Sequence, residues 1–199
     1  MKLRYGPTSP FVRKVLVVAC EAGLEGRLER IATKVWAPES DIGKDNPLGK
    51  IPALILDDGS VLYDSPVICA YLASLNPGAG LVPEGKARWQ ALKLEALADG
   101  ILDAAIARRH ESARAPERQE PALVARYAKV VGRALEALEA EAGSWDTALT
   151  IGQIAAGVAC GYLDFRFGHE DWREGRPRLA AWYERFSQRP SMQASVPKE

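Results

Sequence analysis

Ser9 is the first residue whose type and setting could do chemistry. It lies in the segment Thr8-Ser9-Pro10-Phe11, and serine followed by proline is typical of a helix N-terminus. The serine hydroxyl there lies beside unpaired backbone N–H groups and the positive end of the helix dipole, which together favour an anion. A thiolate is an anion that needs such a setting, because an ordinary cysteine thiol has a pKa of about 8.5. A plain N-cap role explains the same segment.

A proline and a second serine stand at two other informative positions. Pro52 follows Ile51 where a strand is predicted to begin. Because proline lacks an N–H and X-Pro bonds become cis far more readily than others, this step favours a cis peptide bond. Ser65 precedes Pro66 at the start of a predicted helix. The alternative for Pro52 is an exposed proline with a trans peptide bond, and the alternative for Ser65 is an ordinary helix cap.

The elements that must position these residues alternate between strand and helix patterns. The order over the first part of the chain is strand, helix, strand, helix, strand, strand, helix, with a turn at Asp57-Asp58-Gly59-Ser60 between the paired strands. The strands are predicted over 3–5, 28–33, 51–56 and 61–63. The helices are predicted to begin at Pro10, Glu39 and Pro66, the last with Ser65 as its cap, and to end by Gly23, Asp45 and Asn76.

The second part of the chain reads as helical throughout. Gly and Pro are frequent in residues 77–85, and this composition predicts a domain boundary there. Amphipathic runs cover 89–106 and 123–141, an apolar helix begins at 151 behind a capping box of Thr150 and Gln153, and a last stripe spans 179–186. The predicted domains are therefore residues 1–78 and 86–199, joined by a linker over 79–85.

Composition limits the classes of partner. The 199 residues contain 26 Lys plus Arg and 26 Asp plus Glu, so no global field attracts nucleic acid or an anionic membrane. No apolar run approaches the roughly 18 residues of a membrane span, and no signal-like segment follows Met1, so we expect a cytoplasmic protein.

The cysteines and histidines do not form a site pattern. Cys20, Cys69 and Cys160 are odd in number, far apart and never in a C-x-x-C pair, which favours buried free thiols over disulfides, zinc or a dithiol redox centre. His110 and His169 lack metal-ligand spacing and a nucleophile partner. We expect no metal.

Four segments in order resemble the glutathione S-transferase family, of the bacterial serine type. They are Thr8-Ser9-Pro10-Phe11, Asn46-Pro47-Leu48-Gly49-Lys50-Ile51-Pro52, Tyr63-Asp64-Ser65-Pro66, and Thr150-Ile151-Gly152-Gln153 at the head of the core helix. The resemblance covers essentially the whole chain. It implies α/β plus all-α architecture: a thioredoxin-like βαβαββα domain followed by a helical-bundle C-terminal domain. The chain departs from the family in having Asp64 where Glu is common and Gln153 where Asp is usual.

The resemblance also implies a glutathione site on the first domain. Ser9 would stabilise the glutathione thiolate, with Tyr5 and then Thr8 as rivals, because tyrosine-type transferases place a phenol near the end of the first strand. The remaining implied contacts are the backbone of Ile51 before a cis Pro52 for the cysteinyl part, Lys50 for the glycyl carboxylate, and Ser65 with Asp64 for the γ-glutamyl carboxylate and ammonium.

The implied activity is a detoxifying transfer in which bound glutathione, as co-substrate, attacks a small hydrophobic electrophile. The electrophile pocket is expected between the domains and lined by Phe11, Asp103, Ile106 and Arg109. The resemblance implies a homodimer. Two alternatives stay open: a glutathione-dependent peroxidase, isomerase or thiol transferase on the same site, and a non-catalytic binding module with this fold.

Overall fold

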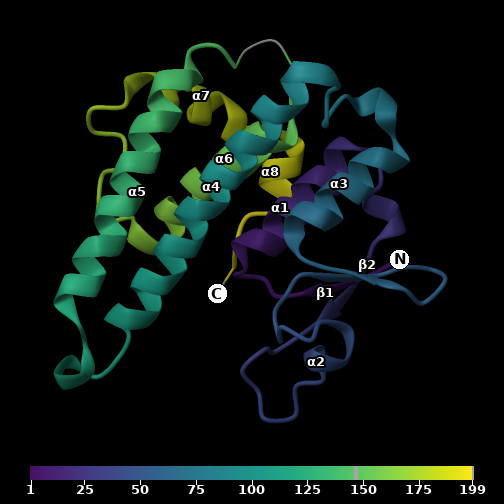
Figure 1. Ribbon diagram of the computed structural model, residues 1–199, viewed down its shortest axis with the longest axis horizontal. Helices are drawn as coiled ribbons and strands as arrows, with labels where there is room; N and C mark the ends of the chain where they lie inside the picture. The colour runs from purple at the N-terminus through teal and green to yellow at the C-terminus, as the bar shows by residue number, and fades with distance from the viewer. Residues whose placement is uncertain (146–147, 199) are drawn as a thin grey trace. The chain divides into compact units, whose positions relative to one another are not determined.

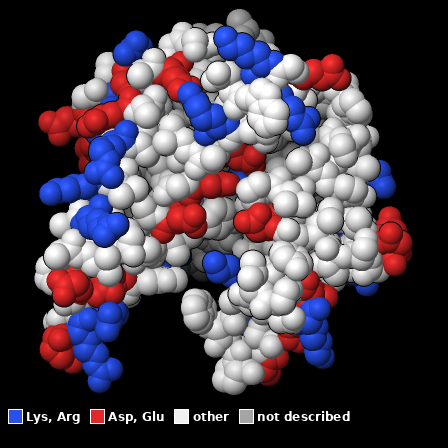
Figure 2. Space-filling model, viewed as in Figure 1, with Lys and Arg blue, Asp and Glu red and all other residues white. Residues whose placement is uncertain are grey.

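The computed structural model describes residues 1–145 and 148–198. Contacts divide these residues into two compact units, one formed by 1–88 with 190–198 and the other by 89–189. The C-terminal residues 190–198 therefore group with the first unit, whereas the predicted domain bounds of 1–78 and 86–199 stay a prediction. Both basic and acidic side chains occur on the face drawn in Figure 2.

The first unit contains a four-stranded mixed sheet in the order β2-β1-β3-β4. β1 is parallel to β2 and antiparallel to β3, and β3 is antiparallel to β4. Figure 1 shows α1 and α3 on one face of this sheet and α2 beyond the other. The bounds are β1 Lys2–Tyr5, α1 Pro10–Glu21, β2 Glu29–Ala32, α2 Ile42–Asp45, β3 Ala53–Ile55, β4 Val61–Leu62 and α3 Ser65–Leu75, which confirms the predicted order.

The core of this sheet forms where apolar strand residues meet the two larger helices. Leu3 and Leu54 are paired across β1 and β3 and fully buried, and α1 packs against α3 above them. The single-turn helix α2 has little apolar surface of its own. It is held to β1 by ion pairs from Arg4 to Asp41 at 3.0 Å and to Asp45 at 2.5 Å.

The second unit is helical, as predicted. Its elements are α4 Gly85–Ser112, whose first turn groups with the other unit, α5 Pro121–Ala142, α6 Ile151–Phe167 and α7 Pro177–Ser187. α4 extends beyond the predicted 89–106 at both ends. α6 is almost wholly buried, and its capping box is present, with the Thr150 N–H donating to Gln153 Oε1 at 2.6 Å. The short helix α8 Pro190–Ala194 was not predicted.

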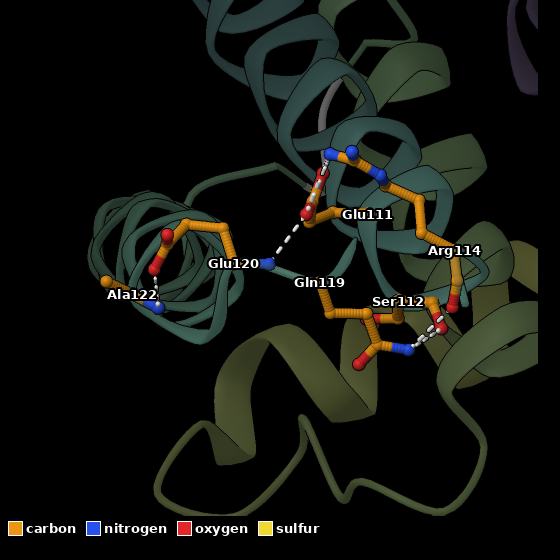
Figure 3. A network of polar contacts seen from close by, with 6 residues as sticks. All are labelled: Glu111, Ser112, Arg114, Gln119, Glu120 and Ala122. Atoms are coloured by element: carbon orange, nitrogen blue, oxygen red, sulfur yellow. Dashed lines mark hydrogen bonds and ion pairs between the residues drawn. The ribbon is translucent and has the colours of Figure 1, made fainter. Parts of the chain in front are cut away.

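A polar network fixes the turn between α4 and α5 (Figure 3). Glu111 accepts hydrogen bonds from the Glu120 N–H at 2.7 Å and from Arg114 Nη1 at 3.1 Å, while Gln119 Nε2 donates to the Arg114 carbonyl at 2.9 Å. The hydrogen bond from the Glu120 N–H, and to a smaller extent the one from Arg114, holds the pKa of Glu111 below its ordinary value. The turn that carries Pro116 is thus closed by specific bonds, and α5 begins in a defined direction.

Glu139 of α5 plays a similar part at the start of α7. It is 9% exposed and accepts hydrogen bonds from the N–H groups of Leu179 at 2.7 Å and Arg178 at 3.2 Å, and from Arg178 Nε at 3.1 Å. Burial alone would raise the pKa of Glu139, but these bonds outweigh burial and leave the pKa below its ordinary value. A depressed pKa stabilises the fold at neutral pH, and this contribution is lost as the pH falls through the folded-state pKa.

We therefore expect Glu139→Gln to lower the free energy of unfolding by about 1–2 kcal/mol at neutral pH, because a charged acceptor of two helix N–H groups becomes neutral. The difference from the unsubstituted protein should shrink as the pH falls through the folded-state pKa of Glu139, which lies below the ordinary value of about 4.3, because Glu139 then becomes uncharged like the glutamine. Denaturant titrations of both proteins at neutral and acidic pH measure this difference in the free energy of unfolding. Glu136→Gln, on the exposed face of α5, is the control and should change little. An undiminished difference at low pH would contradict the electrostatic explanation.

Candidate functional site

Ser9 is the N-cap of α1, as predicted. Its backbone is extended (φ −78°, ψ 119°), and its Oγ accepts a hydrogen bond from the Val12 N–H at 3.3 Å. Within the described residues the Ser9 hydroxyl hydrogen has no acceptor, and the Phe11 N–H has no partner. Pro10 has no N–H to offer. The N-terminus of α1 therefore presents one hydroxyl donor and one amide donor to an incoming anion.

Tyr5 lies close to Ser9, and the two residues line the same small pocket. Tyr5 is the last residue of β1, and its ring centroid is 5.8 Å from the Arg30 guanidinium carbon. Thr8 is half-buried in the turn between them but does not line this pocket. The geometry thus keeps Ser9 and Tyr5 together as candidates and separates Thr8 from them.

Ile51 and Pro52 lie directly behind the turn that carries Ser9. The Ile51–Pro52 peptide bond is cis, as predicted. A Cβ added at Gly6 would be 2.7 Å from Ile51 Cδ1, so glycine at this position lets the two segments touch. Among the described residues, neither the N–H nor the carbonyl of Ile51 has a hydrogen-bond partner. This peptide is therefore open to pair with an extended ligand backbone, as a strand pairs with a sheet edge.

The loop before Ile51 is held by Asn46, which is 1% exposed. Its Nδ2 donates to the Lys50 carbonyl at 2.8 Å, and its Oδ1 accepts from the Leu48 N–H at 3.0 Å. The Lys50 side chain itself is exposed. The buried asparagine thus fixes the backbone that leads to Ile51, which the sequence pattern had not indicated.

At the start of α3 the structure corrects one detail. Asp64, rather than Ser65, is the N-cap residue, and Ser65 is the first helical residue. The shift arises because the Asp64 carbonyl already accepts the first helical hydrogen bond, from the Ile68 N–H at 3.0 Å. The Asp64 side chain is exposed and does not cap the helix; the Tyr63–Asp64 peptide is also cis. Ser65 is 2% exposed, and its hydroxyl has no partner within the described part of the chain.

Strand register brings these three segments to one end of the sheet. Arg4 of β1 is paired with Ala53 of β3, so the end of β1 meets the beginning of β3. Leu54 is paired with Leu62 of β4, so the last residue of β4 lies at the same end of the sheet. Ser9, Ile51 and Ser65 follow or precede these strand ends and thus gather there. The predicted contact residues Ser9, Lys50, Ile51, Pro52, Asp64 and Ser65 all lie on loops or helix starts at this edge.

The residues predicted for the electrophile pocket divide between the two units. Phe11 is half-buried in the first turn of α1. Asp103, Ile106 and Arg109 follow one another at three-residue spacing on α4, so Ile106 is a surface neighbour of each of the other two. The pocket itself stays a prediction.

Arg13 is a residue that the sequence interpretation missed. It is one turn beyond Ser9, 7% exposed, and its Nη2 donates to the Met192 carbonyl at 3.1 Å while Nε donates to Ser195 Oγ at 3.4 Å. The signal available was a cation inside the apolar run of α1. Its partners could not be found from the sequence because they lie at the far end of the chain.

The three cysteines are free and wholly or partly buried. Cys69 and Cys160 are buried and Cys20 is half-buried. Burial raises the pKa of Cys160. The pKa of Cys20 is raised mainly by burial and also by the negative charge of Glu25. The described residues contain no cluster of three His, Cys, Asp or Glu side chains fit for a metal ion. Over the same residues, no helix combines the length and apolar character needed to cross a membrane.

Comparison with known proteins gives consistent matches to both halves of the chain. The family model for the glutathione S-transferase N-terminal domain matches residues 8–75, and that for the C-terminal domain matches residues 121–185. The uncharacterized GST-like protein YibF of Escherichia coli (strain K12) is 33% identical over 99% of this chain and 98% of its own.

Two solved structures of a glutathione transferase family member from Pseudomonas fluorescens Pf-5 are more similar still. The crystal structure with bound glutathione is 46% identical, with a TM-score of 0.93 over 100% of this chain and 99% of that one. The crystal structure with bound S-(propanoic acid)-glutathione is 45% identical, with a TM-score of 0.91 over 100% of both chains.

Proposed function

Because the chain belongs to the glutathione S-transferase family, we propose that it binds reduced glutathione on its first unit and conjugates it, through the thiol sulfur, to a small electrophile. One observation carries the proposal: three sets of open polar groups meet at one end of the sheet. They are the hydroxyl and amide at the mouth of α1, the unpaired Ile51 peptide, and the hydroxyl and N–H groups at the start of α3.

These groups match the parts of the tripeptide one by one. The Ile51 peptide pairs with the cysteinyl backbone, and Ser65 with the α3 amides binds the γ-glutamyl carboxylate. Asp64 is exposed beside Ser65 and faces the γ-glutamyl ammonium, while Lys50 serves the glycyl carboxylate. With both ends held, the sulfur lies at Ser9. The relative from Pseudomonas fluorescens that binds glutathione supports this assignment.

The chemistry at Ser9 is stabilisation of a thiolate. The thiol proton leaves to solvent, and the sulfur anion accepts hydrogen bonds from the Ser9 hydroxyl and the Phe11 N–H at the positive end of α1. The thiolate then attacks an electrophilic carbon: a C–S bond forms, the bond to a halide breaks, and the halide leaves with its electron pair. Stabilisation of the anion and proximity of the reactants supply the rate enhancement.

Calorimetry with reduced glutathione tests the binding step, and ultraviolet titration of the bound thiolate tests its activation. We expect binding, and ionisation of the bound thiol at a pH below the ordinary value of about 8.5. Ser65→Ala should raise the Kd by about tenfold, because a charged carboxylate loses a hydroxyl donor. Ser74→Ala, on the exposed side of α3, is the matched control and should leave Kd unchanged. Absence of binding heat in the unsubstituted protein would contradict the proposal.

The family resemblance further supports two properties that we include in the proposal: a detoxifying role in the cytoplasm and a homodimeric state. Sedimentation velocity measures the second directly. A single species with the mass of one 21.7 kDa chain would contradict the dimer.

A further inference from the structure

A pocket of about 130 Å³ lies beside Ser9 within the first unit. Tyr5, Ser9 and Val12 line one side, and Ser195, Val196 and Lys198 from the C-terminal segment line another. An apolar cavity of about 150 Å³ can hold a benzene ring, so the pocket is of the size of one small substituted ring. Ser9, to which the proposed function assigns the glutathione sulfur, is among its lining residues.

The C-terminal segment is fixed along α1 in a way that builds this pocket. Ser191 Oγ donates to Glu21 Oε1 at 2.5 Å near the end of α1, and Arg13 donates to Met192 and Ser195 nearer its beginning. The segment therefore runs back along α1 toward Ser9. Residues 196–198 follow the contact between Arg13 and Ser195 in the chain, and this contact therefore places Val196 and Lys198 at the pocket.

The charged residues that line the pocket are all cations: Arg13, Arg30 and Lys198, with no Asp or Glu among the lining residues described. Arg13 is bonded to the C-terminal segment, and Arg30 lies 3.6 Å from Glu25. Lys198 is exposed and has no acidic partner in the part of the chain that the structure describes. Cationic side chains around a pocket favour an anionic ligand.

We propose that this pocket selects electrophiles that carry a carboxylate. This inference rests on the proposed function. Lys198 and Arg30 attract the carboxylate, and Val12 and Val196 contact the apolar ring. For a chloronitrobenzoate, the glutathione sulfur forms a bond to the ring carbon and chloride leaves with the C–Cl electron pair. The thiol proton goes to solvent, and the carboxylate remains unchanged beside Lys198.

A pair of substrates of nearly equal shape tests the selection. At saturating glutathione, kcat/KM is measured for a chloronitrobenzoate and for the corresponding neutral chloronitrobenzamide. Lys198→Gln and Arg30→Gln should each raise KM for the benzoate about tenfold, since each removes a charge-assisted contact, and leave KM for the amide unchanged. Lys2→Gln, an exposed cation at the opposite end of β1 from Tyr5, is the control and should alter neither.

Glutathione itself carries carboxylates, so its own KM is the second readout. It should not change in Lys198→Gln. A rise in KM for glutathione with no change in benzoate selectivity would mean that the pocket holds the tripeptide, and it would overturn the inference. Equal effects on benzoate and amide would overturn it as well.

Binding of the two conjugates separates this inference from the proposed function. Calorimetry compares the carboxylated and the carboxamide conjugate of glutathione and needs no turnover. Tighter binding of the carboxylated conjugate, lost in Lys198→Gln, supports the pocket even if neither electrophile reacts, in which case the transferase activity alone fails. Equal Kd values for the two conjugates would overturn the pocket assignment whatever the activity.

Discussion

Replacing Ser9 by alanine is expected to lower kcat for glutathione conjugation by about 100-fold at neutral pH, while the protein still folds and still binds glutathione. The variant loses the hydroxyl at the mouth of α1 and keeps the Phe11 amide and the helix dipole, so stabilisation of the thiolate falls but does not vanish. Removal of one preorganised donor to an anion typically costs about 10²–10³ in rate. Steady-state kinetics with a chlorodinitrobenzene measure it.

The pH profile distinguishes loss of thiolate stabilisation from general damage. In Ser9→Ala the apparent pKa of kcat should rise toward the value of a free thiol, about 8.5, so the deficit should narrow at alkaline pH. A damaged fold would give a deficit that does not depend on pH. Ser9 also caps α1, and loss of a cap costs about 1 kcal/mol of stability, so unfolding curves must show the variant folded under assay conditions.

Tyr5→Phe and Thr8→Ala are the comparisons that assign the role. Tyr5 lines the same pocket as Ser9, whereas Thr8 does not. We expect both variants to retain most of the activity. If Tyr5→Phe abolishes conjugation and Ser9→Ala leaves it intact, the phenol is the thiolate donor and the assignment to Ser9 is wrong.

Local signals explain why much of the site could be predicted from the sequence. Ser-Pro steps mark the starts of α1 and α3 within one residue, because the cap and the first turn depend on neighbouring residues only. The Ile51–Pro52 step likewise predicted its own cis bond. The one-residue shift at Asp64 follows from which carbonyl accepts the first helical bond, a choice that the pattern leaves open.

Contacts between distant segments explain what could not be predicted. Arg13 and Met192 are separated by 179 residues, and neither one indicates the other in the sequence. Helix α8 has only five residues, too few to show a helical period, and it packs against α1. The sequence pattern indicated only a turn at the buried Asn46, although its side chain bonds to the backbone of Leu48 and of Lys50. The pocket beside Ser9 depends on such contacts, so its positive lining emerged only from the folded chain.

Replacing Gly157 by alanine is expected to lower the free energy of unfolding by about 3 kcal/mol, the largest stability effect we predict. A Cβ at this position of α6 would lie 2.3 Å from Cε1 and 2.4 Å from Cδ1 of Phe186. The Phe186 ring cannot retreat easily because it is 6% exposed and stacked on Trp182, with ring centroids 4.7 Å apart. Trp182 in turn meets the edge of Trp145 at 4.8 Å. Overpacking therefore displaces a connected aromatic group.

Gly132→Ala supplies a control of opposite sign. Gly132 lies inside α5, and a Cβ added there meets nothing within 4 Å. Alanine should therefore stabilise the fold by up to about 1 kcal/mol through helix propensity alone. The same propensity gain applies to Gly157, so the two variants differ only in what the new methyl group contacts. Denaturant unfolding of both variants measures the difference. Stabilisation by Gly157→Ala would mean that α7 yields at Phe186, and the close packing of α6 against α7 would then be wrong.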